Sequence, residues 1–148
     1  MKKLLSIAAL AAVFALPAFA ETEPLSIVSG DKTHAFQVDV AATPEARAKG
    51  LNGVEALAKD HGLLVDYRKV TEQESISMKG VKMDLDMLFL DGEGTVVAIA
   101  NSARAGSLRA IAPGVSAAAV LEIPGGQAVA LGLKPGDKVK NKMFGNGG

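Results

Sequence analysis

Residues 77–94 read Ser-Met-Lys-Gly-Val-Lys-Met-Asp-Leu-Asp-Met-Leu-Phe-Leu-Asp-Gly-Glu-Gly, a segment in which the strongest strand signal of the chain adjoins a dense cluster of charge. Side chains alternate between the two faces of a strand, so one face here is apolar and the other is charged. Leu88 and Leu90 then make both faces apolar. We therefore expect a strand that begins in contact with solvent and ends buried. The apolar face carries Val81, Met83, Leu85, Met87 and Phe89, and the charged face carries Lys82, Asp84 and Asp86.

A turn and a second apolar segment follow directly. The residues from Asp91 to Gly94 favour a tight reversal, and the segment from Thr95 to Ala100 reads Thr-Val-Val-Ala-Ile-Ala. Two apolar runs separated by such a turn are typical of a β-hairpin. We expect this hairpin to lie at the centre of the fold.

The rest of the chain predicts further short strands and little helix. One short α-helix is expected at about 43–50, because Thr43 can cap its first turn, Pro44 suits the first helical position and Gly50 can end it. Minor helical turns are expected within 51–58 and 127–131. Strand–helix–strand alternation, which would indicate a parallel sheet, is not evident, so we predict a mainly β fold, a compact antiparallel β-barrel or sandwich. The other expected strands cover residues 25–29, 34–40, 62–67, 72–78, 116–123 and a short segment from 136.

The first 20 residues have the three regions of a secretory signal peptide. Lys2 and Lys3 precede an apolar run over residues 4–16, and Ala18-Phe19-Ala20 forms a small-residue cleavage site. We predict cleavage after Ala20. With a signal of bacterial type, the expected destination is the periplasm or the exterior of the cell.

Cleavage would leave one β domain over residues 21–144 and a disordered tail over 145–148. The mature chain would have 128 residues, with 14 of the 16 basic residues against 16 acidic ones. This near-neutral balance does not indicate a nucleic-acid partner. A domain of this size does not require disulfides, in keeping with the absence of cysteine. No segment after the leader is long and apolar enough to predict a membrane span.

A set of short motifs also recurs in order along the mature chain. They are Gly50-Leu51, Gly62-Leu63-Leu64, Met78-Lys79, residues 85–90, Gly94, Val120-Leu121-Glu122-Ile123, Gly125, Gly132 and Gly136-Asp137-Lys138-Val139. In order and spacing this set resembles the family catalogued as domain of unknown function 192 (DUF192). The resemblance implies a compact, mainly β domain that is often exported and has no established biochemical activity.

The chain departs from the usual pattern of that family at several positions. The family commonly reads Trp-Met-Lys-Asn-Thr and then, a few residues later, Pro-Leu-Asp. The departures fall on the polar and aromatic positions best suited to contact a ligand. This chain keeps Met78, Lys79, Leu85 and Asp86, but it has Ser77, Gly80, Val81 and Asp84 at the other positions, and Asn52 where Met is common after Gly-Leu.

The paired carboxylates Asp84 and Asp86 are the first chemical candidates. They lie two residues apart on one strand face, where such a pair can hold a cation or share a proton. Oxygen cages for hard cations need six or more ligands, and no further acidic residue or histidine falls at a spacing that completes one. We therefore predict no metal site and no cofactor.

Four residues are the candidate ligand-binding set: Met78, Lys79, Asp86 and Glu122. Lys79 could be a base or nucleophile, or it could form a structural ion pair with Asp86 or Glu122. Glu122 lies in the apolar run from Val120 to Ile123, so its carboxyl must be paired, raised in pKa or directed outward. We expect Lys79, Asp86 and Glu122 to converge in the fold.

Two functions remain open from the sequence. The first is an exported binding or interaction module that uses a groove between the central hairpin and the loop over residues 101–114. Its partner would be a small molecule or a protein of the cell envelope. The second is a hydrolase or lyase in which Lys79 works with Asp86 or Glu122 as acid and base. The sequence identifies no catalytic residue set and leaves open whether the protein is an enzyme.

Overall fold

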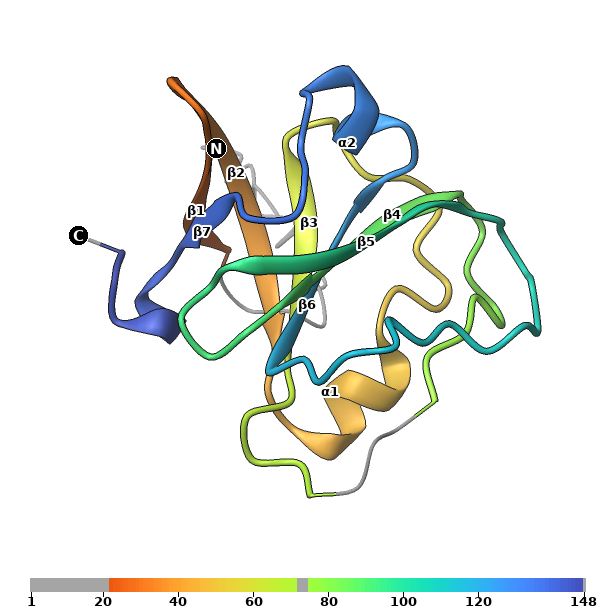
Figure 1. Ribbon diagram of the computed structural model, residues 1–148. Helices are drawn as coiled ribbons and strands as arrows, with labels where there is room; N and C mark the ends of the chain where they lie inside the picture. Colours follow the sequence, from red (N-terminus) through yellow and green to blue (C-terminus); the bar gives the residue numbers. More distant parts are fainter. Residues whose placement is uncertain (1–21, 72–74, 148) are drawn as a thin grey trace, which may run out of the picture.

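The predicted central hairpin is present. The computed structural model describes residues 22–71 and 75–147, and in it β4 (Leu85–Leu90) pairs antiparallel with β5 (Val96–Ala103) (Figure 1). β4 begins at Leu85, later than the alternating pattern suggested, and residues 81–84 precede it as an irregular segment. The period of two still holds, because the alternate residues from Val81 to Phe89 all pack into one apolar cluster.

The expected solvent contact at the start of this segment is found at Lys82 and Asp84, which are exposed and precede the strand, but it is wrong for the strand itself. All six residues of β4 are buried, and Asp86 has no exposed surface. The reason is tertiary: β4 is flanked on one side by β5 and on the other by β6 (Ala119–Pro124), so neither of its edges is free.

The described residues form one seven-stranded sheet with the order β5-β4-β6-β3-β2-β1-β7. This architecture confirms the predicted mainly β fold with one short helix. The remaining strands are β1 (Glu23–Ser29), β2 (Lys32–Ala41), β3 (His61–Asp66) and β7 (Lys138–Lys140), and the helical elements are α1 (Pro44–Lys49), α2 (Gln127–Ala130) and the 3-10 turn η1 (Lys142–Phe144).

The sheet curls until its two outer strands meet. An isolated bridge joins Thr95, just before β5, to Lys138 of β7. Beside it the Val139 amide donates to the Gly94 carbonyl oxygen at 2.8 Å, and the Val96 amide donates to the Asp137 carbonyl oxygen at 2.9 Å. These backbone contacts give the curled sheet the shape of a half-barrel that is closed at one corner, and Figure 1 shows β5 passing across the other strands toward β7.

One strand pair corrects the prediction. β2 and β3 run parallel, with Val38 opposite Gly62 and Val40 opposite Leu64, and α1 lies in the connection between them. The sequence does contain one strand–helix–strand unit, since the expected strands over residues 34–40 and 62–67 flank the expected helix, but their local patterns do not reveal that these two strands are neighbours in the sheet. Parallel neighbours need a crossover connection, and residues 42–60 supply it.

The short helix forms for the reasons that its sequence suggests. The Thr43 hydroxyl accepts a hydrogen bond from the Ala46 amide at 3.1 Å, Pro44 occupies the first turn and Gly50 ends the helix with a φ of 47°. The further helical turn expected within residues 51–58 does not form, and turns and irregular backbone occupy that segment. The helical turn expected near residue 127 is α2.

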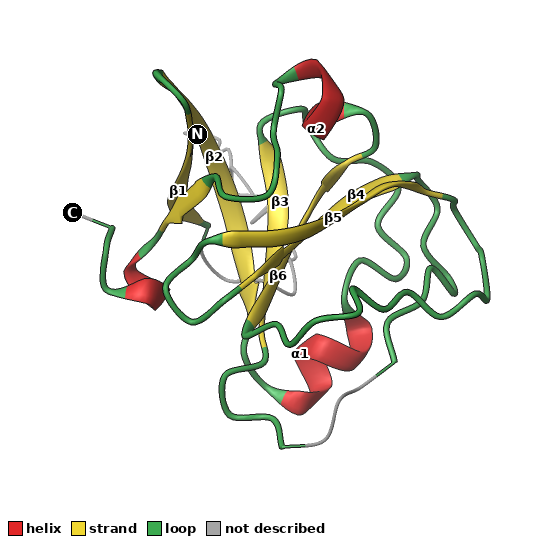
Figure 2. Ribbon diagram, viewed as in Figure 1, coloured by secondary structure: helices red, strands yellow, loops and turns green. Residues whose placement is uncertain are grey.

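Two apolar clusters occupy the two faces of the sheet. The first lies within the curl, because it unites strands from both ends of the strand order, including Ile27 of β1, Leu88 of β4 and Val139 of β7. The second lies on the outer face of the central strands β3, β4 and β6, where it is covered by Leu51 and by the segment around Met78. Figure 2 shows α1 and α2 at opposite ends of the molecule.

Two chain segments differ from expectation or fall partly outside the described residues. The strand predicted over residues 72–78 includes residues 72–74, which are not described, and the described remainder forms one isolated bridge between Ile76 and Ile111. In the tail expected to be disordered, the Asn146 side chain donates to the carbonyl oxygens of Glu93 and Val139 at 3.0 and 3.1 Å.

The predicted signal peptide and Gly148 also lie outside the described residues. Among the helices within residues 22–71 and 75–147, none has the length and apolar character needed to cross a bilayer.

Candidate functional site

Glu122 is a buried carboxyl in the middle of the sheet. It lies on β6 between Leu63 of β3 and Met87 of β4, and only 8% of the residue is exposed. Burial raises the pKa of its carboxyl from about 4.5 to about 7, because the charged form loses its hydration. Within the described residues, neither a hydrogen bond nor an ion pair engages this carboxyl. A buried polar group without a partner is costly and calls for an explanation.

The Glu122 carboxyl lies against a cavity of about 360 Å³ on the outer face of the sheet. We call it the Glu122 cavity. Its floor is formed by the central strands, and its walls are the end of α1 with the turn that follows and the segment from Ser75 to Val81. It is lined by Arg47, Ala48, Lys49, Gly50, Leu51, Asn52, Val65, Tyr67, Ser75, Ile76, Ser77, Met78, Lys79, Val81, Leu85, Met87 and Glu122.

Three of the four predicted site residues therefore meet. Met78 is fully buried in the cavity wall, and Lys79 is exposed at the cavity. The Lys79 amide donates to the Ser77 hydroxyl at 3.4 Å. The structural ion pair that the sequence suggested between Lys79 and Glu122 is not formed among the described residues, since no contact within 4.0 Å joins their charged atoms.

Asp86 does not join them, which corrects the prediction that Lys79, Asp86 and Glu122 converge. It lies opposite Ile123 on β6, whereas Glu122 lies opposite Met87, so the two carboxylates point to opposite faces of the sheet. The Asp86 carboxylate accepts hydrogen bonds from the Ser102 amide at 2.7 Å and from the Ala128 amide at 2.8 Å. It thereby holds the end of β5 and the start of α2, and its role is structural.

Asp84 also binds backbone. Its carboxylate accepts from the Ala105 amide at 2.9 Å, and its carbonyl oxygen accepts from the Gly125 amide at 2.9 Å. Together Asp84 and Asp86 hold the loop after β5 and the turn that leads into α2 against the hairpin. Across the described residues, no three histidine, cysteine or acidic side chains gather at a spacing that could hold a metal ion.

The cavity includes charged and polar groups that the sequence analysis did not select. Arg47 and Lys49 reach it from α1, and Tyr67 reaches it from the end of β3. The Arg47 Nη1 donates to the carbonyl oxygens of Ala42 and Asp66 at 2.9 and 3.3 Å. Only the Gly50-Leu51 motif, which follows these residues in the chain, could have pointed to this end of the helix.

Asn52 and Gly80 lie against each other beside the cavity. A Cβ atom on Gly80 would come within 2.5 to 2.7 Å of the Asn52 side-chain amide. Gly80 also has a φ of 74°, a conformation that favours glycine. Both positions depart from the usual family pattern, which has Met and Asn there. In this chain, the amide at position 52 therefore occupies the space that a side chain at position 80 would need.

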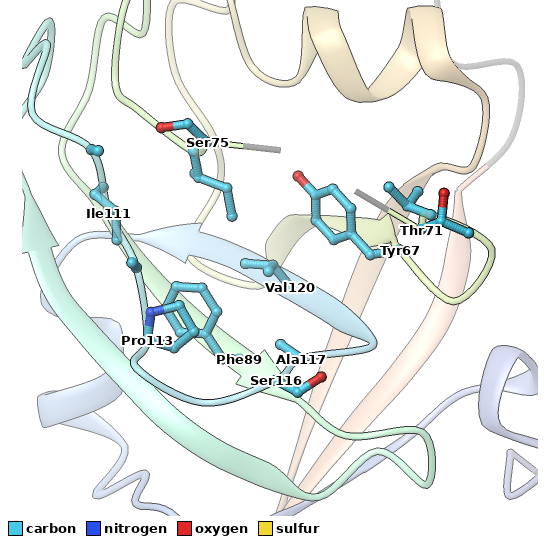
Figure 3. A pocket seen from close by; sticks show the side chains of 13 residues that line it. Tyr67, Thr71, Ser75, Phe89, Ile111, Pro113, Ser116, Ala117 and Val120 are labelled. Carbon is cyan, nitrogen blue, oxygen red and sulfur yellow. The ribbon is translucent and has the colours of Figure 1, made fainter. Parts of the chain in front are cut away.

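A second pocket of about 450 Å³ adjoins the Glu122 cavity and shares Tyr67, Ser75 and Ile76 with it. We call it the Tyr67 pocket. Figure 3 shows Tyr67, Phe89, Pro113 and Ile111 arranged around it. It lies between β4 and β6 of the sheet and residues 110–113 of the long loop, at the place where the sequence suggested a groove. Its full lining is Tyr67, Val70, Thr71, Ser75, Ile76, Phe89, Ala110, Ile111, Ala112, Pro113, Ser116, Ala117 and Val120.

The fold and these cavities define a class of protein: a small, mainly β domain whose curled sheet carries a polar cavity and an apolar pocket side by side on its outer face. The family DUF192, described as an uncharacterized ACR, matches residues 26–141, and the chain belongs to this family.

Two crystal structures are similar to this chain over most of its length. A protein from Sinorhizobium meliloti 1021, described as a "putative transcription regulator", is 32% identical, with a TM-score of 0.78 over 82% of this chain and 95% of that one. A protein of unknown function from Novosphingobium aromaticivorans is 29% identical, with a TM-score of 0.78 over 84% of this chain and 89% of that one. No curated protein matches the sequence.

Proposed function

We propose that this protein is an exported, single-domain binding module and that the Glu122 cavity is its ligand site. The observation that carries the proposal is the Glu122 carboxyl, which is buried in an apolar sheet, engages no group among the described residues and faces a cavity. A carboxyl in this position lowers stability unless something binds to it. A ligand in the cavity would supply the missing partner.

The surroundings of the carboxyl support a binding role. Buried polar groups that converge on a concave, partly apolar cavity are the usual composition of a small-molecule site. Here the apolar part comes from Val65, Leu85 and Met87 of the sheet, and the polar part comes from Glu122 and from the residues at the cavity mouth. Strands of the sheet hold Glu122 rigidly, while the mouth is built from loops.

A second candidate function is acid–base catalysis by a hydrolase or lyase. It is favoured by the pKa of Glu122, which burial raises to about 7, close to the value at which a carboxyl can both accept and donate a proton. Lys79 would be the second group, since it lies at the same cavity. Asp86 has no part in this alternative, because its carboxylate is bound to backbone on the other face.

The proposed site of action is the periplasm or the exterior of the cell. This part of the proposal rests on the leader-like residues 1–20, with a basic start, an apolar middle and the Ala-Phe-Ala cleavage site. An exported binding module would meet small molecules of the envelope or a protein of the envelope there.

Thermal-shift screening with divalent metals, sugars, amines and carboxylic acids tests the binding role. At least one class should raise the melting temperature by several degrees. Asn52→Trp should abolish that shift, because Asn52 lines the cavity, whereas Glu55→Trp, on an exposed residue outside the lining, should retain it. A shift that survives Asn52→Trp, or the absence of any shift, would contradict the proposed site.

The same ligand distinguishes the two functions. After incubation with the protein, mass spectrometry should recover the ligand unchanged if the protein is a binding module. Conversion by the wild-type protein that is lost in Glu122→Gln would instead establish the enzyme.

A further inference from the structure

The charged residues that the structure describes around the Glu122 cavity are mostly basic. Among the described residues of the lining, Arg47 and Lys49 come from α1 and Lys79 comes from the loop, and Glu122 is the one that is acidic. The strands β3 and β4, which flank Glu122, contribute only apolar residues to this lining, and Tyr67 adds a phenol. Because burial raises the pKa of Glu122 to about 7, near neutral pH a large fraction of this carboxyl is uncharged. Because Lys79 lines the cavity and a large fraction of Glu122 is uncharged, an anion fits the cavity better than a cation does.

A protonated carboxyl is a hydrogen-bond donor, and it pairs well with a second carboxylate. Two carboxyl groups in contact share one proton, because two negative charges at that distance repel each other strongly. A lysine ammonium beside such a pair would balance its remaining charge through a charge-assisted hydrogen bond. Glu122 and Lys79 at one cavity provide both groups.

The adjoining Tyr67 pocket indicates what the rest of the ligand is. Its lining is mainly apolar, with Phe89 and Val120 on the sheet side and Ile111 and Pro113 on the loop side (Figure 3). Tyr67, Ser75 and Ile76 border both spaces, so a ligand anchored in the polar cavity can extend past them into the apolar one.

We propose that the two spaces together bind a monocarboxylic acid with an apolar body, whose carboxylate shares a proton with Glu122 beside Lys79 and whose body fills the Tyr67 pocket. This inference rests on the proposed function and specifies the ligand class of the same site. Binding takes up a proton from solvent whenever Glu122 is ionised in the free protein. The ligand anion favours the protonated form of Glu122, so affinity falls as pH rises through about 7.

Isothermal titration calorimetry of the protein, expressed as the full chain, tests the ligand class with 4-phenylbutanoate. Three comparison ligands measure what each part of 4-phenylbutanoate contributes to binding. Acetate lacks the apolar body, 4-phenylbutanamide lacks the negative charge and 4-phenylbutylamine carries a positive charge instead. We expect 4-phenylbutanoate to bind at least about tenfold more tightly than each of the three at pH 6. Its affinity should fall about fivefold between pH 7 and pH 8, because the protonated fraction of Glu122 drops from about one half to about one tenth, with uptake of about one proton per ligand at pH 8.

Matched variants test the two named groups and the pocket. Glu122→Gln should keep the binding of 4-phenylbutanoate at pH 6 and lose its pH dependence, whereas Glu55→Gln, on an exposed residue, should keep both. Lys79→Met should weaken binding about tenfold, and Lys82→Met, on an exposed lysine outside the lining, should not. Ala117→Phe, which fills the Tyr67 pocket, should weaken binding of 4-phenylbutanoate, while Val115→Phe, outside the lining, should leave it unchanged.

The possible outcomes distinguish a failure of the carboxylic-acid inference from a failure of the proposed binding function. Tighter binding of the amine or the amide, or a pH dependence that persists in Glu122→Gln, would overturn the carboxylic-acid inference and leave the binding role intact. If none of these probes binds, and no class of compound in the thermal-shift screen binds either, both the carboxylic-acid inference and the proposed binding function are contradicted. Circular dichroism of each variant establishes that lost binding is not lost folding.

Discussion

Asp86 and Glu122 lie on neighbouring strands one position out of register, and their carboxylates point to opposite faces of the sheet. Asp86 points toward α2 and is bound by two backbone amides. Glu122 points toward α1 and faces a cavity. Both residues are buried in the sheet, but Asp86 is bound by backbone amides, whereas the Glu122 carboxyl is available to a ligand. Their substitutions should therefore have opposite effects.

Asp86→Ala should lower the free energy of unfolding by about 3 kcal/mol, because the amides of Ser102 and Ala128 would lose a charged acceptor in a buried setting. Urea denaturation followed by circular dichroism measures the change. Asp84→Ala is the control and should cost less, since Asp84 is exposed and accepts one side-chain hydrogen bond. A loss below about 0.5 kcal/mol for Asp86→Ala would show that these hydrogen bonds do not stabilise the fold.

Glu122→Gln should remove a pH dependence of stability. The folded-state pKa of Glu122 is about 7 and lies above its ordinary value of 4.5, so the folded protein holds a proton that the unfolded chain has released. The contribution of Glu122 to the free energy of unfolding is consequently greatest below about pH 4.5. The wild type loses roughly 3 kcal/mol of this free energy as pH rises through 7. Above that pH the loss is complete.

Denaturation of both proteins at pH 5 and pH 8 measures this contribution. The difference in unfolding free energy between Glu122→Gln and wild type should shift in favour of the variant by about 2.5 kcal/mol from pH 5 to pH 8. Other titrating groups are common to both proteins and cancel in this difference. A constant difference across the range would mean that Glu122 ionises as an exposed glutamate does.

Gly80→Ala should destabilise the protein by about 1 to 2 kcal/mol, because the φ of 74° disfavours alanine and the new Cβ would meet the Asn52 amide. Part of that cost should disappear when Asn52 is also changed to Ala, which removes the obstructing group. A double-mutant cycle by thermal denaturation should give a coupling energy of at least about 0.5 kcal/mol between the two positions. Additive effects would show that the two residues do not interfere with each other.

Residues 1–20 should direct export. Expressed as the full chain in a Gram-negative bacterium, the protein should be recovered from the periplasm or medium with Glu21 as its first residue, as intact-mass measurement would show. A chain that starts at a methionine placed before Glu21 should remain in the cytoplasm. Recovery of uncleaved full-length protein from the cytoplasm would contradict the proposed location.

Local patterning was sufficient for most of the secondary structure. The hairpin follows from alternating side chains around a turn, and α1 follows from Thr43, Pro44 and Gly50, because these signals act between residues that are close in sequence. The choice of Lys79 and Glu122 also came from the sequence, through the resemblance to DUF192 and through the conflict between a carboxyl and its apolar neighbours.

The missed features depend on contacts between distant residues. The parallel pairing of β2 with β3, the closure of Thr95 against Lys138 and the cations brought from α1 to the cavity have no local pattern that could reveal them. The predicted convergence of Asp86 with Glu122 failed for the same reason, since it depended on a strand register that neither strand specifies alone.

The sequence by itself therefore determined most of the strands and the one α-helix with a capped first turn, because alternation and capping depend on near neighbours. It did not determine that Asp86 and Glu122 would both be buried. Only the tertiary structure decided what each buried carboxyl does. A shift of one residue in strand pairing reverses the face that a side chain occupies. The register of β4 against β6 directs Asp86 to backbone amides and Glu122 to a cavity, and that register is set by the packing of the whole sheet.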